Sequence, residues 1–224
     1  MVRIFAVLAV LAVLLLAANF AIGLAAGDFN SVALQKKAAQ IRVLELENQA
    51  RRNRTRSSPE LKTARQALSE ADAAFAGPRR WMTIHMLLGS AAALVAVLVN
   101  SITVTYFIGT SRWCKEVCQT YRLDAELAEA STRLKRGTFP WALAGILAII
   151  AIVGLGAAAD PSGANWRSSA SLVLPHYVAA IVGLAVVVVS FWMQANRIAE
   201  NHRVIEAILA AVRTVRGEKE PLPT

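Results

Sequence analysis

Four long runs of apolar residues dominate this chain, at about residues 4–26, 82–108, 140–159 and 170–193, and none of them contains Asp, Glu, Lys or Arg. A helix needs about 20 apolar residues to cross the roughly 30 Å hydrocarbon core of a bilayer. Each run reaches that length. The sequence therefore predicts an all-α protein with a four-transmembrane-helix bundle.

The first run also has features of a secretory signal peptide, because Arg3 precedes it and Gly23-Leu24-Ala25 offers small residues near its end. The apolar core of a signal peptide is about 7–15 residues long, and the run from residue 4 to residue 26 exceeds that length. We therefore expect an uncleaved membrane anchor.

Composition limits the classes of function. Of 224 residues 56% are hydrophobic, which leaves too little chain outside the four runs for a separate soluble enzyme domain. The net charge of +9 comes from Lys and Arg in the segments that flank the runs. Anionic lipid headgroups are the natural partner for basic residues in that place, so we expect the lipid bilayer as partner and no nucleic acid.

The runs and the segments between them predict the organisation of the chain. In order, we expect transmembrane helix 1 (1–27), a coiled-coil-like helical hairpin (28–80), transmembrane helix 2 (81–109), a basic cytoplasmic helical loop (110–139), transmembrane helix 3 (140–159), a short outer loop (160–169), transmembrane helix 4 (170–193), an amphipathic cytoplasmic helix (194–217) and a disordered tail (218–224).

The distribution of Lys and Arg predicts orientation. The loop 110–139 and the tail are basic while the loop 160–169 has only Arg167, which places both termini in the cytoplasm of the inner (plasma) membrane. The segment 28–80 holds eleven basic residues and opposes this orientation. The prediction stands because long segments count less than short loops in setting topology.

The segment 28–80 carries two apolar stripes. Ser57-Ser58-Pro59-Glu60 is a helix start signal between them, and Gly77-Pro78 is expected to end the second helix. The first stripe is Leu34, Ile41 and Leu44, and the second is Leu61, Ala64, Leu68, Ala71 and Phe75. Residues 34–75 can thus form a solvated connector or a surface for a protein partner.

The tail continues the fourth run as a helix that Gly217 ends. Its apolar seam is Ile198, Ile205, Ile208, Val212 and Val215, with Asn201 among them. Either the loop after the second run covers this seam, through Trp113, Val117 and Tyr121, or the same region 198–215 of a second copy does. We favour the first, with Asp124 starting a short helix that ends at Gly137.

Few polar residues lie inside the runs. Asn100 is deep in the second run, so we expect it to bond to a neighbouring helix. Cys114 and Cys118 share one helical face, but structural zinc takes four ligands and no further pair follows. We therefore predict no catalytic residue and no metal site.

His85 and His176 are the candidate cofactor-binding residues. They lie near the starts of parallel runs, and Gly89 and Gly183 could leave room for a porphyrin, so the pair could ligate haem b. Judged against the aromatic residues that end each run, the two histidines differ in depth by six residues, about 9 Å, which argues against the pairing.

One resemblance concerns residues 81–212. It rests on NSITVTYFIGTSRWCKEV at 100–117, on Thr138-Phe139-Pro140-Trp141 and on Asp160-Pro161. These resemble uncharacterised four-span membrane proteins of planctomycete-type bacteria. The resemblance implies a bacterial inner-membrane setting and carries no known activity.

The sequence has no nucleophile elbow and no phosphate-cradling glycine loop. We therefore expect an integral membrane protein that acts as a non-enzymatic scaffold or interaction protein. The alternative is a haem b electron-transfer subunit that uses His85 and His176.

Overall fold

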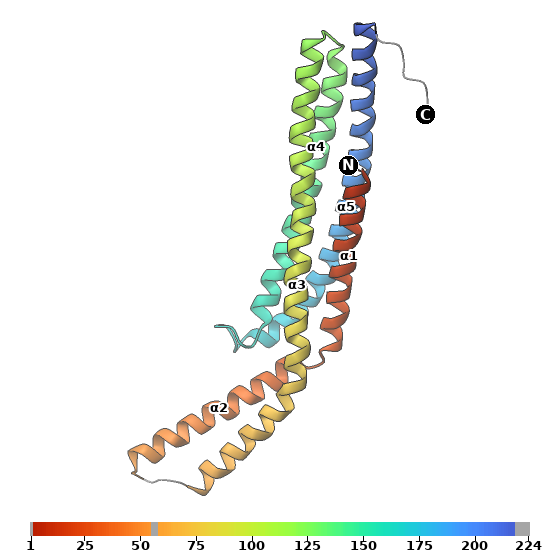
Figure 1. The fold of residues 1–224 in the computed structure, drawn as a ribbon. Helices are drawn as coiled ribbons and strands as arrows, with labels where there is room; N and C mark the ends of the chain where they lie inside the picture. The colour runs from red at the N-terminus through yellow and green to blue at the C-terminus, as the bar shows by residue number, and fades with distance from the viewer. Residues whose placement is uncertain (1, 55–57, 218–224) are drawn as a thin grey trace. The chain divides into compact units, whose positions relative to one another are not determined.

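A computed structural model describes residues 2–54 and 58–217. Within these residues the chain forms five α-helices and no strand. The helices, labelled in Figure 1, are α1 (Val2–Ala25), α2 (Phe29–Arg52), α3 (Pro59–Thr120), α4 (Ala125–Ala159) and α5 (Ser169–Arg216). The all-α prediction is confirmed. The expected disordered tail, 218–224, lies outside the described residues, as does Ser57 of the predicted start signal.

Four of these helices, α1, α3, α4 and α5, are long and apolar enough to cross a membrane. They contain the four apolar runs of the sequence, which is consistent with a multi-pass membrane protein.

Two predicted helix ends are wrong. Helix α3 runs for 62 residues through Gly77-Pro78, and α4 runs for 35 residues through Gly137 and Pro140, so the expected short helix after Asp124 is the start of α4. Proline removes one backbone hydrogen bond. Ending a helix next to the hydrocarbon region would leave several backbone groups unpaired, which costs more there. The helices therefore continue through these prolines.

Other helix ends follow their local signals. The Ser58 side chain accepts a hydrogen bond from the Leu61 backbone N–H at 3.2 Å, and Asp28 does the same for Ser31 at 3.2 Å. Gly217 has φ +68 after the last residue of α5, as a helix-ending glycine requires. The predicted start near Ser58 and the predicted stop at Gly217 are confirmed.

The chain divides into two compact units, which we describe separately. Unit 1 comprises 1–14, 92–150 and 182–224, and unit 2 comprises 15–91 and 151–181. The borders between the units fall inside helices α1, α3, α4 and α5.

Unit 1 buries many small residues together with a few large ones such as Phe5 and Phe107, and it exposes many large apolar residues. Its buried positions include Ala9, Ala12, Ala92, Ala96, Ala142 and Gly145. Its exposed positions include Leu94, Leu98, Leu143, Leu147 and Ile150. Helices in lipid pack through small residues because lipid tails solvate large apolar side chains. This arrangement indicates a surface that faces hydrocarbon.

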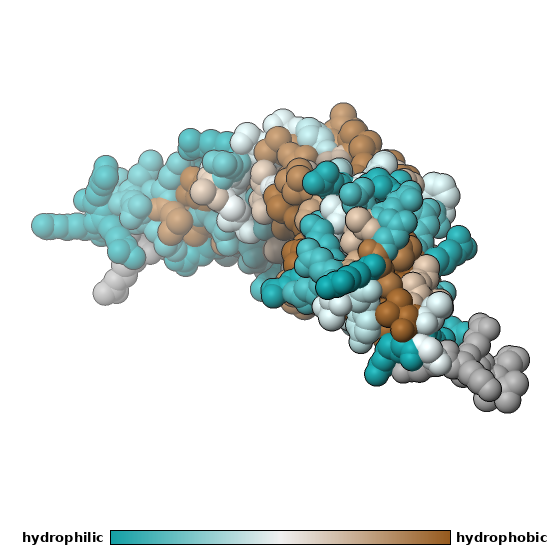
Figure 2. Space-filling model, turned by 90° about the horizontal axis from the view of Figure 1, so that it is seen from above, coloured by the Kyte–Doolittle hydropathy of each residue, from teal (hydrophilic) through white to brown (hydrophobic). Residues whose placement is uncertain are grey.

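Beyond the apolar runs, unit 1 continues as a packed end made by α3, α4 and α5 (top of Figure 1). Seen from above in Figure 2, the near end carries mostly hydrophilic side chains, drawn teal, with hydrophobic ones between them. Cys114, Cys118, Ala128 and Ile208 form the buried cluster. Around it pack Trp113, Val117, Leu123, Leu127, Val204, Ile205 and Val212. The part of the tail seam from Ile205 to Val212 is therefore covered within the chain, as expected, by Trp113 and Val117. Val215, at the end of the predicted seam, is 59% exposed.

In unit 2, α2 packs against the first part of α3. Val43 and Leu46 of α2 form a buried cluster with Leu61 and Ala64 of α3. The ring centroids of Phe29 and Phe75 lie 5.5 Å apart, Lys36 pairs with Asp72 at 2.7 Å, and Arg65 pairs with Glu47 at 2.8 Å. The second predicted stripe, which begins with Leu61 and Ala64, is thus on the contact face.

The stripe predicted on α2 is wrong. Ile41 and Leu44 are 38% and 59% exposed, while Val43 and Leu46 are buried. The contact face instead repeats every seven residues at Phe29, Lys36 and Val43. This face is hard to recognise in the sequence because a charged residue, Lys36, lies in its middle. Lys36 can lie on the contact face because its ammonium group pairs with Asp72.

Candidate functional site

Unit 2 brings the two predicted histidines together. The ring centroids of His85 on α3 and His176 on α5 lie 6.4 Å apart, with an angle of 79° between the ring planes. The difference in depth expected from the sequence therefore does not separate them. Two imidazoles from two helices meet inside segments that are apolar enough to cross a membrane.

His85 is held by α1. Its Nδ1 lies 3.0 Å from the backbone oxygen of Asn19. Because a carbonyl oxygen only accepts, the tautomer that satisfies this contact carries its hydrogen on Nδ1 and leaves Nε2 with a free lone pair. Gly23 makes room for the ring, since a Cβ there would lie 2.9 Å from Cε1 of His85.

His176 sits against α4 in a similar way. A Cβ on Gly156 would lie 2.9 Å from Cε1 of His176, so only glycine accommodates the ring at this separation. Among the described residues, Nδ1 of His176 and Oδ1 of Asn19 are buried without a hydrogen-bond partner. A buried polar atom left unpaired costs about 1–3 kcal/mol. Both atoms are therefore available to a water molecule or a ligand.

The distance between the two rings is compatible with both imidazoles binding one metal ion, including the iron of haem b. Two nitrogens that bind one metal ion from opposite sides, each about 2.0–2.1 Å away, lie about 4 Å apart, and ring centroids lie further apart by the radii of the two rings. The observed 6.4 Å is compatible with that separation.

The porphyrin ring itself has no slot among these residues. Beside Gly89, where we expected room for it, a Cβ would meet the Asn19 side chain at 2.8 Å. The space next to Gly23 is filled by the imidazole of His85, and the space next to Gly156 is filled by the imidazole of His176. A haem would therefore require these side chains to move. Over the described range, no three His, Cys, Asp or Glu side chains form a metal-binding group.

Unit 1 contains a buried polar layer around Asn100. Nε2 of Gln194 on α5 donates to Oδ1 of Asn100 on α3 at 2.9 Å and to Oγ of Ser190 at 2.7 Å. The Ser190 hydroxyl donates to the backbone oxygen of Trp141 on α4 at 2.6 Å. Asn100 therefore has the partner on a neighbouring helix that we expected. A Cβ on Gly145 would lie 2.9 Å from its Oδ1, so a glycine on α4 makes the layer possible.

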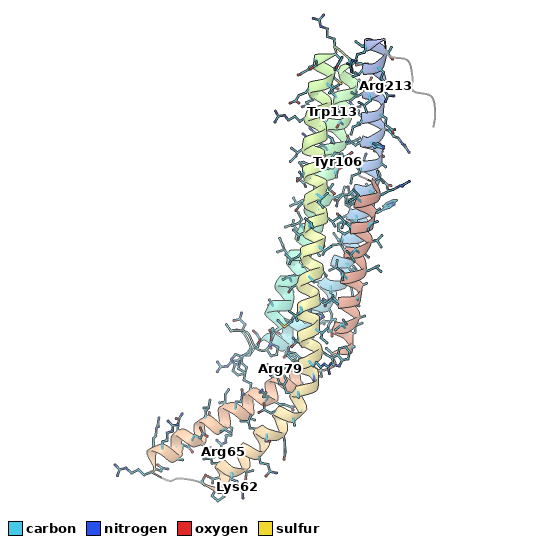
Figure 3. All side chains as sticks on the ribbon, viewed as in Figure 1. Lys62, Arg65, Arg79, Tyr106, Trp113 and Arg213 are labelled. Carbon is cyan, nitrogen blue, oxygen red and sulfur yellow. The ribbon has the colours of Figure 1, made fainter. Side chains whose placement is uncertain are left out.

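A second polar layer centres on Asn201 of α5. Its Nδ2 donates to the Tyr106 hydroxyl at 3.1 Å and to Thr110 at 3.0 Å, and its Oδ1 accepts from Ser131 at 2.8 Å (Tyr106 is labelled in Figure 3). One carboxamide thus bonds to both α3 and α4. The sequence placed Asn201 on the seam but did not indicate these partners.

Cys114 and Cys118 are free thiols inside the α3–α4–α5 cluster. Burial raises the pKa of both thiols, and the hydrogen bond of Cys114 with Ser131 only partly offsets this. A buried thiol with a raised pKa is mostly protonated at neutral pH and is a poor nucleophile. These cysteines contribute to packing.

Gln194 is the polar residue that the sequence analysis missed. It lies one residue beyond the fourth apolar run and four residues after Ser190, so the two share a helical face. The spacing of Ser190 and Gln194 could have predicted a polar face on this helix. The partner atoms on α3 and α4 could not be read from it, because which helices are neighbours is a tertiary property.

No family model, no curated protein and no solved structure matches this chain.

Proposed function

We propose that this protein is a non-enzymatic membrane scaffold that binds a protein partner through one face of α2. The observation that carries the proposal is the exposure of Ile41 and Leu44, which are 38% and 59% exposed on a helix whose opposite face is already packed. Residues three apart on a helix share one face, so the two side chains form one apolar surface.

The surroundings of these residues resemble a helix recognition surface. Arg42 and Glu45 flank the apolar pair and form an ion pair at 3.6 Å. A hydrophobic groove in a partner protein typically binds an amphipathic helix through apolar residues three or four positions apart, which are flanked by polar residues. Covering such anchors contributes roughly 25 cal/mol for each Å² of apolar surface removed from water.

The rest of the hairpin, residues 28–80, suits it to hold a partner. Two cross-helix ion pairs and the Val43–Leu61 cluster fix α2 on α3. Helix α3 then continues without interruption from Pro59 through the apolar run 82–108. A protein bound to α2 would thus be linked to the apolar run 82–108 through one uninterrupted helix.

We further propose the inner membrane as location, with both termini in the cytoplasm. The basic loop 110–139 and the basic tail support this orientation. The hairpin would then face the other side of the membrane.

Site-specific photo-crosslinking in cells tests the partner surface. A photoreactive residue at Leu44 is expected to give one discrete protein adduct. A photoreactive residue at Gln40 should give an adduct with the same protein, and Ile41→Ser with Leu44→Ser should remove the Gln40 adduct. The matched control places the probe at Gln49, which is exposed on another side of α2. Equal adducts from Leu44 and Gln49, or none from Leu44, would contradict the proposal.

The second candidate function is electron transfer by haem b ligated by His85 and His176. The 6.4 Å separation of the two rings favours this function. The side chains that already occupy the space next to Gly89, Gly23 and Gly156 count against it, because they leave no room for a porphyrin.

An absorbance spectrum of protein purified after expression with supplied haem decides between these functions. A Soret band that His85→Ala and His176→Ala abolish, and that His202→Ala retains, would establish the haem function. His202 is the matched control because it is exposed and pairs with Glu206 at 3.3 Å. The scaffold proposal predicts a colourless protein.

A further inference from the structure

Unit 1 has an open groove between α4 and α5. It has a volume of about 440 Å³, and its lining includes Arg133, Leu134 and Gly137 from α4 and Arg197, Glu200 and Val204 from α5. The lining therefore combines two guanidinium groups, one carboxylate and an apolar floor. The proposed scaffold function does not use this groove.

The two guanidinium groups retain most of their hydrogen-bonding capacity. Arg197 pairs with Glu200 at 3.2 Å, and Arg133 contacts Glu129 at 3.8 Å. An arginine has five N–H donors in a planar fork, and that fork matches the oxygens of a phosphate. Each arginine is next to one glutamate, Glu129 or Glu200, but keeps N–H donors that the glutamate does not use. These free donors can bind the oxygens of an anion.

Gly137 keeps the groove open. A Cβ added there would lie 3.9 Å from Cζ of Arg197, in van der Waals contact with the guanidinium group. A larger side chain at this position would occupy the space next to Arg197. The opening in front of Arg197 thus depends on the absence of a side chain at residue 137.

The groove lies at the depth of lipid headgroups. Gly137 precedes the third apolar run by three residues, and Arg197 follows the fourth run by four. At 1.5 Å per residue, both lie about 5–6 Å beyond the hydrocarbon edge, where the headgroup region of a bilayer begins. Leu134 and Val204 supply the apolar part of the lining.

We infer that this groove binds the phosphate of an anionic phospholipid headgroup, with Arg133 and Arg197 as its ligands. Basic pockets between transmembrane helices are known to select anionic lipids. Depth favours a lipid over free phosphate, because the groove adjoins the hydrocarbon region and not the bulk solvent alone.

Native mass spectrometry of the full-length protein in detergent tests the inference. The probes are short-chain phosphatidylglycerol, phosphatidylcholine and inorganic phosphate, each titrated separately. Wild-type protein should retain phosphatidylglycerol in preference to phosphatidylcholine and should not retain inorganic phosphate. Arg133→Gln with Arg197→Gln should weaken phosphatidylglycerol binding by about tenfold or more, the loss expected for at least one charge-assisted hydrogen bond.

Two further variants make the test specific. Gly137→Leu fills the groove while keeping both charges and should cause a similar loss. Arg112→Gln with Arg213→Gln removes the same charge outside the groove and should leave binding within about twofold of wild type. Circular dichroism checks that each variant keeps its helix content.

Three results would overturn the inference. The first is equal weakening by the groove and control pairs, which would mean diffuse charge attraction. The second is Gly137→Leu binding like wild type. The third is retention of inorganic phosphate, or displacement of the lipid by it, which would mean a general anion site.

Discussion

At the scale of single residues, buried carboxamides hold unit 1 in one arrangement. Asn201 bonds to residues of α3 and α4 from its place on α5, and Gln194 links to Asn100 in the layer nearer the middle of the helices. An apolar seam alone tolerates sliding by a turn, whereas a bonded carboxamide fits one register only. These residues therefore specify how the three helices pack.

Replacing Asn201 with alanine tests this role. The change leaves the Ser131 and Tyr106 hydroxyls without their partner, and we expect a loss of about 2 kcal/mol in the free energy of unfolding. His202→Ala next to it should change stability by less than about 0.5 kcal/mol, because His202 is exposed. Unfolding of the detergent-solubilised protein by denaturant measures both, and equal effects would contradict the role of Asn201.

The buried thiols predict a dependence on pH. Burial raises the pKa of Cys114 and Cys118 above the ordinary value of 9.0, so above that pH the folded state keeps thiol protons that the unfolded chain has lost. The unfolded state then binds fewer protons, and stability must fall as pH rises. Wild-type protein should therefore lose more unfolding free energy between pH 8 and pH 10 than a Cys114→Ala, Cys118→Ala variant. Identical pH profiles of the two proteins would contradict the prediction.

At the scale of helices, the sequence predicted faces well where apolar residues repeat regularly. The α5 seam at Ile198 and Ile208 is buried as its spacing predicts. The predicted contact face of α2 was wrong because Lys36 lies on the true contact side, while Ile41 and Leu44 form a second apolar stripe on the opposite side of the helix. Periodicity cannot choose between two apolar stripes on one helix, since the choice depends on the partner helix.

The buried and exposed sides of α5 give a matched pair of substitutions. Ile208 is fully buried and the adjacent Leu209 is 40% exposed. Ile208→Asp places a charge in the α3–α4–α5 cluster and should cost about 3 kcal/mol or more, which opens the tail to trypsin at Arg203 and Arg213. Leu209→Asp should leave the tail as resistant as in wild type. Equal digestion of both variants would mean that the seam is not packed.

At the scale of the whole molecule, hydropathy was enough to predict the helical class and the four apolar helices. It could not predict that α3 and α4 continue through Pro78 and Pro140, because proline is a stop signal in water and a tolerated feature at the membrane. The sequence identified His85 and His176 as candidates, but the 6.4 Å between their rings follows from how α3 and α5 pack. Depth counted along each helix did not capture that packing.

We propose that the chain crosses the membrane four times, with the hairpin on the outer side and the tail in the cytoplasm. Single cysteines at Lys62, labelled in Figure 3, and at Val215 report on the two sides. Each is introduced into the Cys114→Ala, Cys118→Ala background, and both positions are exposed. With the outer envelope permeabilised, a membrane-impermeant maleimide should label the cysteine at 62 in intact cells and the one at 215 only after the inner membrane is disrupted. Labelling of both positions in intact cells, or of the cysteine at 215 alone, would contradict the account.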